Sequence, residues 1–324
     1  MNCLVIGGAG FIGSYVVQNL LAKGHHPVIF DFLTDKNALQ KVCEPDEIDN
    51  VDLVYGDVSD LASLVRAVKE YEIDSMVHLA AWQIPGCHAN PTKAITINGI
   101  GFNNTLEAAA LYDVRRVVWA SSNAVFGSPD SHSVDLLPND EYHRPNTVYG
   151  ALKALNEYMA GHFYDTRGVD SIGLRFGLVY GFGRMRGAST FASAMIEKSA
   201  LGEPCDVDNG DAVVDWFYAV DAGQLVMAAL EAPPTPTRAY NVSGDLRGVR
   251  EAADFLTANI PAARLTIKPG TINANWNLDS TLLKEEIGFK HRYSMEAGIR
   301  DAVARVRQSY DLPPLDGFDP VELY

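Results

Sequence analysis

A glycine-rich turn near the start of the chain constrains its fold more than any other feature. The apolar run at residues 3–6 leads directly into Gly7, Gly10 and Gly13, and an apolar helix pattern follows. Gly7 or Gly8 can form a tight turn, Gly10 lets a ligand approach the backbone without a Cβ, and Gly13 lets the helix lie close to the strand. This order predicts the first strand and helix of a parallel sheet, with the helix N-terminus facing a pyrophosphate.

An acidic residue after the next apolar run specifies the ligand further. Asp31 follows the run at residues 28–30, eighteen positions after Gly13. A carboxylate at the carboxyl end of that strand can accept hydrogen bonds from both ribose hydroxyls of an adenosine, and it repels a 2′-phosphate. A glycine cluster alone marks only a turn. With the strand, the helix and the acid around it, the motif predicts a dinucleotide site that prefers NAD to NADP.

Strand and helix patterns alternate through the first half of the chain. Short apolar runs predict strands at residues 4–6, 28–30, 52–55, 75–79, 116–120 and 171–176. Helical patterns lie between them at residues 14–23, 61–70, 98–111 and 148–166. Such alternation gives right-handed crossovers, so we expect an α/β fold, a Rossmann-like doubly wound parallel sheet.

The alternation ends near residue 177, where glycine, proline and loop-forming residues become more frequent. We therefore expect two domains: an NAD-binding domain at residues 1–176 and a smaller C-terminal substrate-binding lobe at residues 177–324, over the carboxyl edge of the sheet. A strand near residues 239–242 is expected to return to the main sheet. A chain of 324 residues that is 47% hydrophobic can bury a sizeable core.

Charge and composition exclude several classes of partner. The formal net charge is −15 and no basic run occurs, so we expect neither nucleic acid nor an anionic membrane as a partner. The four cysteines lie far apart without Cys-x-x-Cys spacing, and no apolar stretch can span a bilayer, which favours a soluble, unprocessed, cytoplasmic protein. The histidines show no metal-ligand spacing, so no metal site is predicted, and we expect His132 and His143 to be solvated in polar loops.

Three functional groups are predicted to meet at the carboxyl edge of the sheet. Tyr149 and Lys153 lie four positions apart in one predicted helix and therefore share a face. Such a pair alone usually means a tyrosine packed beside a solvated lysine. Here Ser121 and Ser122 follow the strand at residues 116–120, at the same edge as the dinucleotide. An adjacent ammonium lowers the pKa of a phenol, so Tyr149 can deprotonate an alcohol while a serine holds the oxygen and a hydride leaves for the nicotinamide.

Motifs of one family are spread over residues 1 to about 245. They are Gly7, Gly10 and Gly13, Gly56-Asp57-Val58, His78-Leu79-Ala80-Ala81, a helix segment from Asn98, Ser121-Ser122-Asn123-Ala124-Val125-Phe126-Gly127, Tyr149-Gly150-Ala151-Leu152-Lys153, and Leu174-Arg175-Phe176. Together they resemble the extended short-chain dehydrogenase/reductase family, the NAD-dependent epimerases and dehydratases typified by UDP-galactose 4-epimerase.

This resemblance implies a set of site residues. The catalytic residues would be Ser122, rather than Ser121, with Tyr149 and Lys153. The cofactor contacts would be Gly7, Gly10, Phe11, Ile12, Gly13, Asp31, Asp57, Val58, Leu79, Ala80, Ala81, Asn98, Tyr149, Lys153 and Phe176. Among these, Asp57 and Val58 would hold the adenine and Lys153 the nicotinamide ribose. The resemblance also implies a homodimer formed through the helices at residues 98–111 and after 148.

Departures from the family pattern concern the substrate. Family members that use nucleotide sugars usually carry Arg-Asp-Phe late in the chain, with the arginine on the diphosphate, and here the segment is Val214-Asp215-Trp216. Valine cannot neutralise a phosphate, which disfavours a UDP- or dTDP-linked substrate. Two arginines in a glycine-bounded loop can instead clamp a carboxylate or phosphate, or remain solvated. The predicted substrate contacts are Trp82, Gln83, Ser122, Asn123, Arg184 and Arg186.

Three classes of function are open from the sequence. The first is a dehydrogenase that releases NADH, and the second is an epimerase or dehydratase that returns the hydride. Asn123-Ala124 stands where dehydratases of the family place Asp-Glu, which disfavours dehydration. Without the diphosphate arginine, oxidation or epimerisation of a small sugar, sugar acid or similar hydroxy compound competes with nucleotide-sugar 4-epimerisation. The third class, a non-catalytic NAD-binding protein, is disfavoured because Tyr149 and Lys153 are both present.

Overall fold

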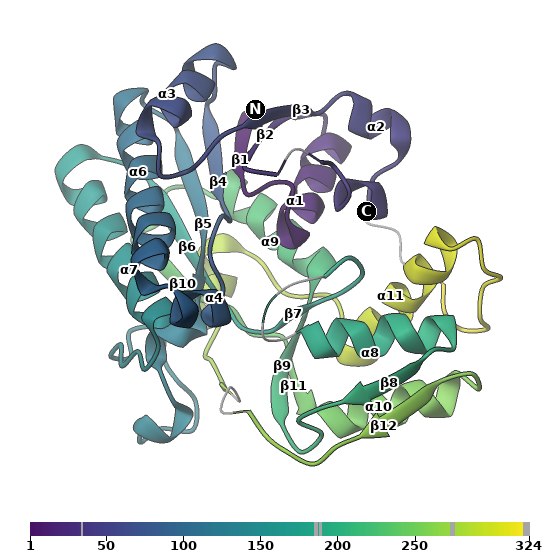
Figure 1. Cartoon of the computed structure of the whole chain (residues 1–324). Coiled ribbons are helices and arrows are strands. Elements are labelled where there is room, and N and C mark those ends of the chain that lie inside the picture. Colours follow the sequence, from purple (N-terminus) through teal and green to yellow (C-terminus); the bar gives the residue numbers. More distant parts are fainter. Residues whose placement is uncertain (34, 185–186, 188–189, 273–275, 320–324) are drawn as a thin grey trace. The chain divides into compact units, whose positions relative to one another are not determined.

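The computed structural model describes residues 1–33, 35–184, 187, 190–272 and 276–319 (Figure 1). The chain divides into two compact units. Unit 1 comprises residues 1–176, 222–242 and 278–290, and unit 2 comprises residues 177–221, 243–277 and 291–324. Two later segments therefore belong with the first 176 residues rather than with their neighbours in sequence.

Unit 1 is built on a seven-stranded sheet in the order β10-β6-β5-β4-β1-β2-β3, in which all neighbouring strands are parallel. The strands are β1 (Asn2–Ile6), β2 (His26–Asp31), β3 (Asp52–Tyr55), β4 (Ser75–His78), β5 (Arg116–Ser122), β6 (Ser171–Phe176) and β10 (Ala239–Asn241). The strand order reverses between β1 and β4, which is the switch point where ligands bind in such sheets. The predicted α/β, Rossmann-like doubly wound parallel sheet is confirmed.

Helices cover both faces of this sheet. They are α1 (Phe11–Ala22), α2 (Pro45–Asp49), α3 (Leu61–Glu70), α4 (Ile84–Ala89), α5 (Pro91–Ala94), α6 (Gly101–Leu111), α7 (Val148–Arg167) and, from residue 222, α9 (Ala219–Glu231). Short 3-10 segments are η1 (Leu39–Lys41), η3 (Asn123–Phe126) and η4 (Pro129–Ser131), and π-helical ones are η2 (Ile95–Ile100) and η5 (Leu283–Ile287). Helices α3, α6 and α7 lie side by side on one face, and α1 lies with α9 on the other (Figure 1).

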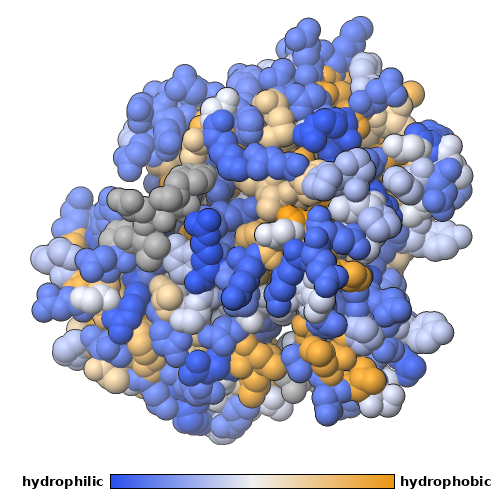
Figure 2. All heavy atoms as spheres, turned by 180° about the vertical axis from the view of Figure 1, so that it is seen from behind, coloured by the Kyte–Doolittle hydropathy of each residue, from blue (hydrophilic) through white to orange (hydrophobic). Residues whose placement is uncertain are grey.

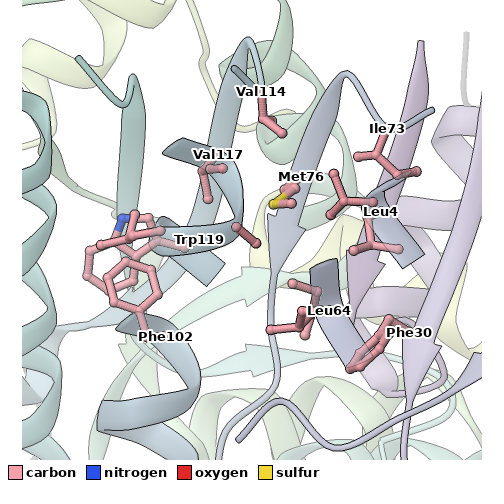
Figure 3. Close-up of a cluster of buried hydrophobic side chains, with 14 of the residues drawn as sticks. Leu4, Phe30, Leu64, Ile73, Met76, Phe102, Val114, Val117 and Trp119 are labelled. Carbon is pink, nitrogen blue, oxygen red and sulfur yellow. The ribbon is translucent and has the colours of Figure 1, made fainter. Parts of the chain in front are cut away.

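The core beneath α3 and α6 joins the central strands into one rigid layer. Leu4 of β1 and Met76 of β4 are fully buried beside Leu64 of α3 (Figure 3). Trp119 of β5 packs on Phe102 of α6 with 4.4 Å between the ring centres, and both rings are fully buried. Burying a side chain of this size contributes about 1.5–3 kcal/mol. This packing fixes the carboxyl ends of β1, β4 and β5, where the predicted site residues lie.

In its described residues, unit 2 contains two smaller sheets and three complete helices. One sheet has the order β11-β9-β7 and the other pairs β12 with β8. The elements are β7 (Val179–Tyr180), α8 (Thr190–Leu201), β8 (Pro204–Val207), β9 (Val213–Tyr218), β11 (Asp245–Gly248), α10 (Val249–Asn259), β12 (Arg264–Ile267) and α11 (Met295–Ser309). Helix α8 packs on both α10 and α11. The buried Tyr180 ring meets the Trp216 ring edge-on, with 5.1 Å between the ring centres, and lies tilted by 42° against the Tyr218 ring, with 5.3 Å between the centres.

One face of the molecule is shown in Figure 2, and it is largely polar. On the face drawn in Figure 2, hydrophilic residues predominate and hydrophobic residues form small separate areas. Within the described part of the chain, no helix combines the length and the apolar character needed to cross a membrane. Exposed apolar side chains do occur on the two neighbouring helices α6 and α7, at Leu111, Leu155 and Tyr158.

Candidate active site

The loop between β1 and α1 is tightly packed against the end of β4. Gly7 has a φ of +83°, and a Cβ at this position would lie 2.7 Å from the backbone nitrogen of Ala80. A Cβ on Gly13 would lie 2.4 Å from the carbonyl oxygen of Gly7. Both positions face backbone atoms that cannot move aside, so only glycine fits there. The glycines thus set how closely α1 and the end of β4 approach the loop.

The start of α1 suits an anionic group. The helix begins at Phe11 with Gly10 as its N-cap, and its first turn contains no acidic residue. The N–H groups of Phe11, Ile12 and Gly13 belong to that first turn, which carries the positive end of the helix dipole. Gly10 places no side chain over this end. A helix start of this kind can bind an anion, so the pyrophosphate contact of these loop residues stays a prediction that the geometry allows.

Asp31 ends β2 and lies beside the glycine loop. It is 7% exposed, its Oδ2 accepts a hydrogen bond from the backbone nitrogen of Ala9 at 3.2 Å, and its Oδ1 accepts one from that of Leu33 at 3.0 Å. Burial raises the pKa of Asp31 above its usual value, and these backbone bonds oppose the rise. Each carboxylate oxygen keeps lone-pair capacity for a ribose hydroxyl. The position fits the predicted adenosine contact.

Six further predicted cofactor residues of unit 1 lie at or shortly after strand ends. The backbone nitrogens of Leu79 and Ala80 donate to the last carbonyl of β1 at 2.8 and 3.1 Å, and the half-buried Ala81 follows. Val58 is buried under α6, whereas the adjacent Asp57 is exposed. Phe176 is buried at the end of β6. All of them follow or end parallel strands of the same sheet, so they share its carboxyl edge.

Helix α7 positions Tyr149 and Lys153. Thr147 caps this helix by accepting a hydrogen bond from the backbone nitrogen of Gly150 at 3.0 Å. Tyr149 is 9% exposed and Lys153 is 2% exposed. The Lys153 Nζ lies 5.6 Å from the centre of the Tyr149 ring and donates to the carbonyl oxygen of Ala120 at 2.5 Å. The pair therefore shares one face of α7, and its lysine is tied to the end of β5.

Burial governs the chemistry of Lys153. It lowers the pKa of this amine from its usual 10.5 to about 8, and the nearby Cys87 and Glu157 oppose that change. Because the pKa stays above 7, the amine is mostly protonated at neutral pH. An ammonium held this close to a phenol favours the phenolate and lowers the pKa of the phenol.

The two serines at the end of β5 have different partners. The Ser121 hydroxyl donates to Glu157 Oε1 at 2.6 Å. Ser122 is 7% exposed and caps η3, where its Oγ accepts a hydrogen bond from the backbone nitrogen of Ala124 at 3.2 Å. A Cβ on Gly150 would lie 2.3 Å from the carbonyl oxygen of Ala124, so the first turn of α7 is pressed against η3. This packing places the segment that contains Ser122 and Asn123 against the first turn of α7, which carries Tyr149.

Trp82 and Gln83 lie between β4 and α4. The Asn98 side chain in η2 bonds to both backbone polar groups of Trp82. Its Oδ1 accepts a hydrogen bond from the backbone nitrogen at 2.7 Å, and its Nδ2 donates one to the backbone oxygen at 2.9 Å. Trp82 packs against the apolar cluster that contains Tyr149, and the Nζ of Lys93 lies 4.7 Å from its ring centre. Gln83 is exposed. The contact between Asn98 and the cofactor stays a prediction, and the structure adds a second role for this amide.

A buried ion pair near the serines was missed from the sequence. Glu157 accepts hydrogen bonds from Nε and Nη2 of Arg175 at 2.9 and 2.7 Å, and the Nε2 of His143 lies 3.1 Å from its Oε2. Glu157 comes four residues after Lys153 in the sequence, and this spacing was a signal that could have pointed to Glu157 as a site residue.

The prediction of a solvated His132 is wrong, because its ring is fully buried between Glu141 and a backbone carbonyl. Within the described residues, no group of three or more potential ligands is arranged to hold a metal ion.

Two of the six predicted substrate contacts, Arg184 and Arg186, belong to unit 2, as does Val214. Arg184 donates to the carbonyl oxygen of Val179 at 2.5 Å, and Arg186 lies outside the described residues. Val214 is buried in β9, and Arg247 of β11 pairs with it across the strands. That arginine was missed from the sequence. It is already bound to acidic side chains, at 2.6 Å from Glu251 and 3.2 Å from Glu296.

A doubly wound sheet with a tight glycine loop and an acidic residue ending β2 defines a dinucleotide-binding protein. Residues 3–243 match the NAD dependent epimerase/dehydratase family. The chain belongs to this family, and the resemblance to the extended short-chain dehydrogenases/reductases seen in the motifs is confirmed.

Relatives with different activities cover nearly the whole chain. The dTDP-glucose 4,6-dehydratase of Salmonella typhimurium is 26% identical over 336 residues, which span 94% of this chain and 92% of that protein. A crystal structure of UDP-glucose 4-epimerase from Thermus thermophilus with NAD is 25% identical, with a TM-score of 0.81 over 95% of this chain and 99% of its own. L-threonine dehydrogenase from Phytophthora infestans is 26% identical, with a TM-score of 0.83 over 96% and 100%. The protein is therefore an NAD-dependent enzyme, as predicted.

Proposed function

We propose that this enzyme takes a hydride from a secondary alcohol of a sugar, sugar acid or similar small hydroxy compound, with Tyr149 as the base. The observation that carries the proposal is the buried ammonium of Lys153, which lies 5.6 Å from the Tyr149 ring centre and is bonded to the end of β5. A phenol beside such a charge loses its proton more readily, and the resulting phenolate can accept the proton of an alcohol.

Each group then has one role. Tyr149 takes the proton of the alcohol at its phenolate oxygen, and the Ser122 hydroxyl holds the same oxygen while it becomes a carbonyl. NAD, when bound, supplies the hydride acceptor. The glycine loop and the start of α1 hold the pyrophosphate, Asp31 holds the adenosine ribose, and Lys153 holds the nicotinamide ribose. In this proposal NAD is bound by unit 1.

Several features favour a small substrate over a nucleotide sugar. Val214 offers no charge to a diphosphate, and the adjacent Arg247 is already paired with two glutamates. Arg184 and Arg186 remain candidates to bind a carboxylate or phosphate on a smaller molecule. The similarity to the L-threonine dehydrogenase of Phytophthora infestans also supports this class, because threonine is a small hydroxy acid.

A nucleotide-sugar 4-epimerase that retains NAD is the alternative. The likeness to the UDP-glucose 4-epimerase of Thermus thermophilus favours it. Dehydration, the activity in the name of the Salmonella relative, is disfavoured here because Asn123 and Ala124 cannot act as the acid and base of an elimination.

The test is a turnover assay against a panel of sugars, sugar acids, hydroxy acids and hydroxy amino acids, followed by nicotinamide absorbance and product analysis. Net NADH formation identifies a dehydrogenase, whereas isomer conversion without it identifies an epimerase. Calorimetry with UDP and UDP-sugars runs in parallel, and we expect weak binding at most. Micromolar binding of a UDP-sugar would overturn the small-substrate proposal and favour the alternative. The Tyr149→Phe variant is the matched control for enzyme-dependent turnover.

A further inference from the structure

A buried set of polar side chains lies one helical turn beyond Lys153 on α7. The Glu157 carboxylate accepts hydrogen bonds from the Ser121 hydroxyl at 2.6 Å and from two nitrogens of Arg175 at 2.7 and 2.9 Å. The Nε2 of His143 lies 3.1 Å from Glu157 Oε2. The Glu157 and Arg175 side chains are only 7% and 6% exposed. These four residues are named the Glu157 cluster below. None of them has a role in the proposed proton or hydride transfer.

The cluster ties α7 to β5 next to the proposed reacting groups. Ser121 is bonded to Glu157, and the preceding Ala120 accepts a hydrogen bond from Lys153 at 2.5 Å. Two consecutive residues of β5 are therefore bonded to two successive turns of α7. Ser122 follows directly in the same strand, so the spacing between Ser122 and Lys153 depends on these bonds. An error of about 1 Å in such a spacing can lower a rate by roughly a hundredfold.

The Arg175 guanidinium is fully used in holding this arrangement. Besides the two bonds to Glu157, its Nη1 donates to the carbonyl oxygen of Asn139 at 2.6 Å and to Asn241 Oδ1 at 3.0 Å, and its Nη2 also lies 3.4 Å from His143 Nε2. A cavity of about 380 Å³ adjoins the cluster and is lined in part by Glu157, Arg175 and Tyr158. Because the arginine donors are already bonded, the cavity presents no open anion site at this guanidinium. The cluster is therefore built to hold groups in place rather than to bind a ligand.

Glu157 also contributes charge near Lys153. The titratable groups that face this amine are Cys87 from α4, His78 from β4, and Tyr149 and Glu157 from its own helix. Glu157 favours the protonated amine, which burial disfavours. Removing the carboxylate charge would also leave Arg175 as an unbalanced positive charge beside the site. Both changes act in the same direction, toward a neutral lysine.

We propose that Glu157 is a positioning residue for the reaction: it fixes Ser122 and Lys153 relative to each other through Ser121 and Arg175, and it supplies the negative charge that balances the lysine. This inference rests on the proposed function, because Ser122, Tyr149 and Lys153 matter to it only as reacting groups. A role limited to stabilising the fold would leave the protonation of Lys153 untouched.

The first test measures Lys153 directly and needs no substrate. In the full-length enzyme with NAD, NMR of protein labelled at the lysine side chains follows the titration of Lys153, assigned from its loss in Lys153→Met. We expect Glu157→Gln to lower its pKa by about one unit. Glu107→Gln is the matched control, because it also removes the carboxylate of an ion pair with an arginine of α7, at 2.6 Å from Arg167. The proposal would be overturned if the pKa of Lys153 were the same in Glu157→Gln as in Glu107→Gln.

The second test uses turnover once a substrate is known. We expect Glu157→Gln to lower kcat by roughly tenfold or more, with little change in KM, and to move the loss of activity at high pH to lower pH. Ser121→Ala keeps the ion pair and should lower kcat several-fold without that pH shift, so it tests the tie to β5 even if Glu157→Gln does not fold. Unchanged kcat in Ser121→Ala would overturn the positioning role. Absence of turnover in the wild-type enzyme would count against the proposed function alone, since the NMR titration is independent of it.

Discussion

Replacing Lys153 by methionine should make the cofactor-free protein more stable while abolishing turnover. The amine is 2% exposed, and burial lowers its pKa from 10.5 to about 8. The folded protein therefore carries an unfavourable charge at neutral pH. Methionine is of similar length, has no charge to desolvate and fits irregular core space. A residue needed for catalysis is here expected to be a source of instability.

The size of the effect follows from the pKa difference and one hydrogen bond. A fall in pKa from 10.5 to about 8 corresponds to about 3 kcal/mol of cost for the protonated lysine. Losing the bond from Nζ to the Ala120 carbonyl offsets about 1 kcal/mol of this gain. Lys153→Met should therefore raise the free energy of unfolding by about 2 kcal/mol at pH 7.

The pH dependence of this difference has a defined sign. Below pH 8 the lysine is protonated in both the folded and the unfolded protein, so the wild type bears the full cost. Between pH 8 and 10.5 the folded state releases its proton first, so the unfolded state binds more protons and wild-type stability rises relative to the variant. Above pH 10.5 both states are neutral and the advantage of the variant disappears.

The assay is urea unfolding of cofactor-free protein, followed by tryptophan fluorescence at pH 7 and pH 10. Removal of NAD is essential because ligand bound to the folded state would mask the difference. Lys69→Met is the matched control, since Lys69 is exposed on α3 and should change stability by less than about 0.5 kcal/mol. A Lys153→Met protein that is less stable than the wild type at pH 7, or a difference that does not shrink toward pH 10, would refute the reasoning.

Four further predictions concern ligands and assembly. Asp31→Ala should narrow the preference for NAD over NADP measured by titration, and equal affinity of the wild type for both would count against the ribose contact. Tyr149→Phe should lower turnover by roughly a hundredfold or more with cofactor affinity nearly unchanged, and near-native activity would remove this phenol from the mechanism. Arg184→Ala or Arg186→Ala should raise KM for an anionic substrate roughly ten- to hundredfold in steady-state kinetics, and an unchanged KM in both would leave these arginines without a substrate role. The exposed apolar residues of α6 and α7 predict a homodimer, so light scattering at micromolar concentration should not give the mass of a monomer.

The parts of the site that sequence reasoning predicted depend on short-range rules. The loop at Gly7 and Gly13 needs residues without a Cβ, and only glycine provides them. Tyr149 and Lys153 share a helix face because they are four residues apart. The doubly wound parallel sheet also follows from alternating strands and helices, because right-handed crossovers leave few arrangements. In each case the pattern can be recognised within a few adjacent segments.

The features that were missed depend on partners far apart in sequence. The bond from Ser121 to Glu157 spans 36 residues, and the bond from Arg175 to Asn241 spans 66. No local pattern specifies either partner. Asn98 likewise bonds to Trp82 only because η2 and the segment after β4 lie together in the folded protein. His132 was predicted to be solvated from its polar neighbours, but Glu141 and a backbone carbonyl satisfy its ring in the interior.

The late position of β10 affects how this chain can be made on the ribosome. Strand β6 is complete at Phe176, yet its outer neighbour is supplied only by Ala239–Asn241. During translation, β6 therefore remains an unpaired edge strand while more than sixty further residues are synthesised. In that interval its backbone can pair with another nascent chain. A chain that terminates before residue 239 keeps this edge permanently. We expect such fragments to aggregate or to depend on chaperones, even though they contain the complete glycine loop and the Tyr149–Lys153 pair.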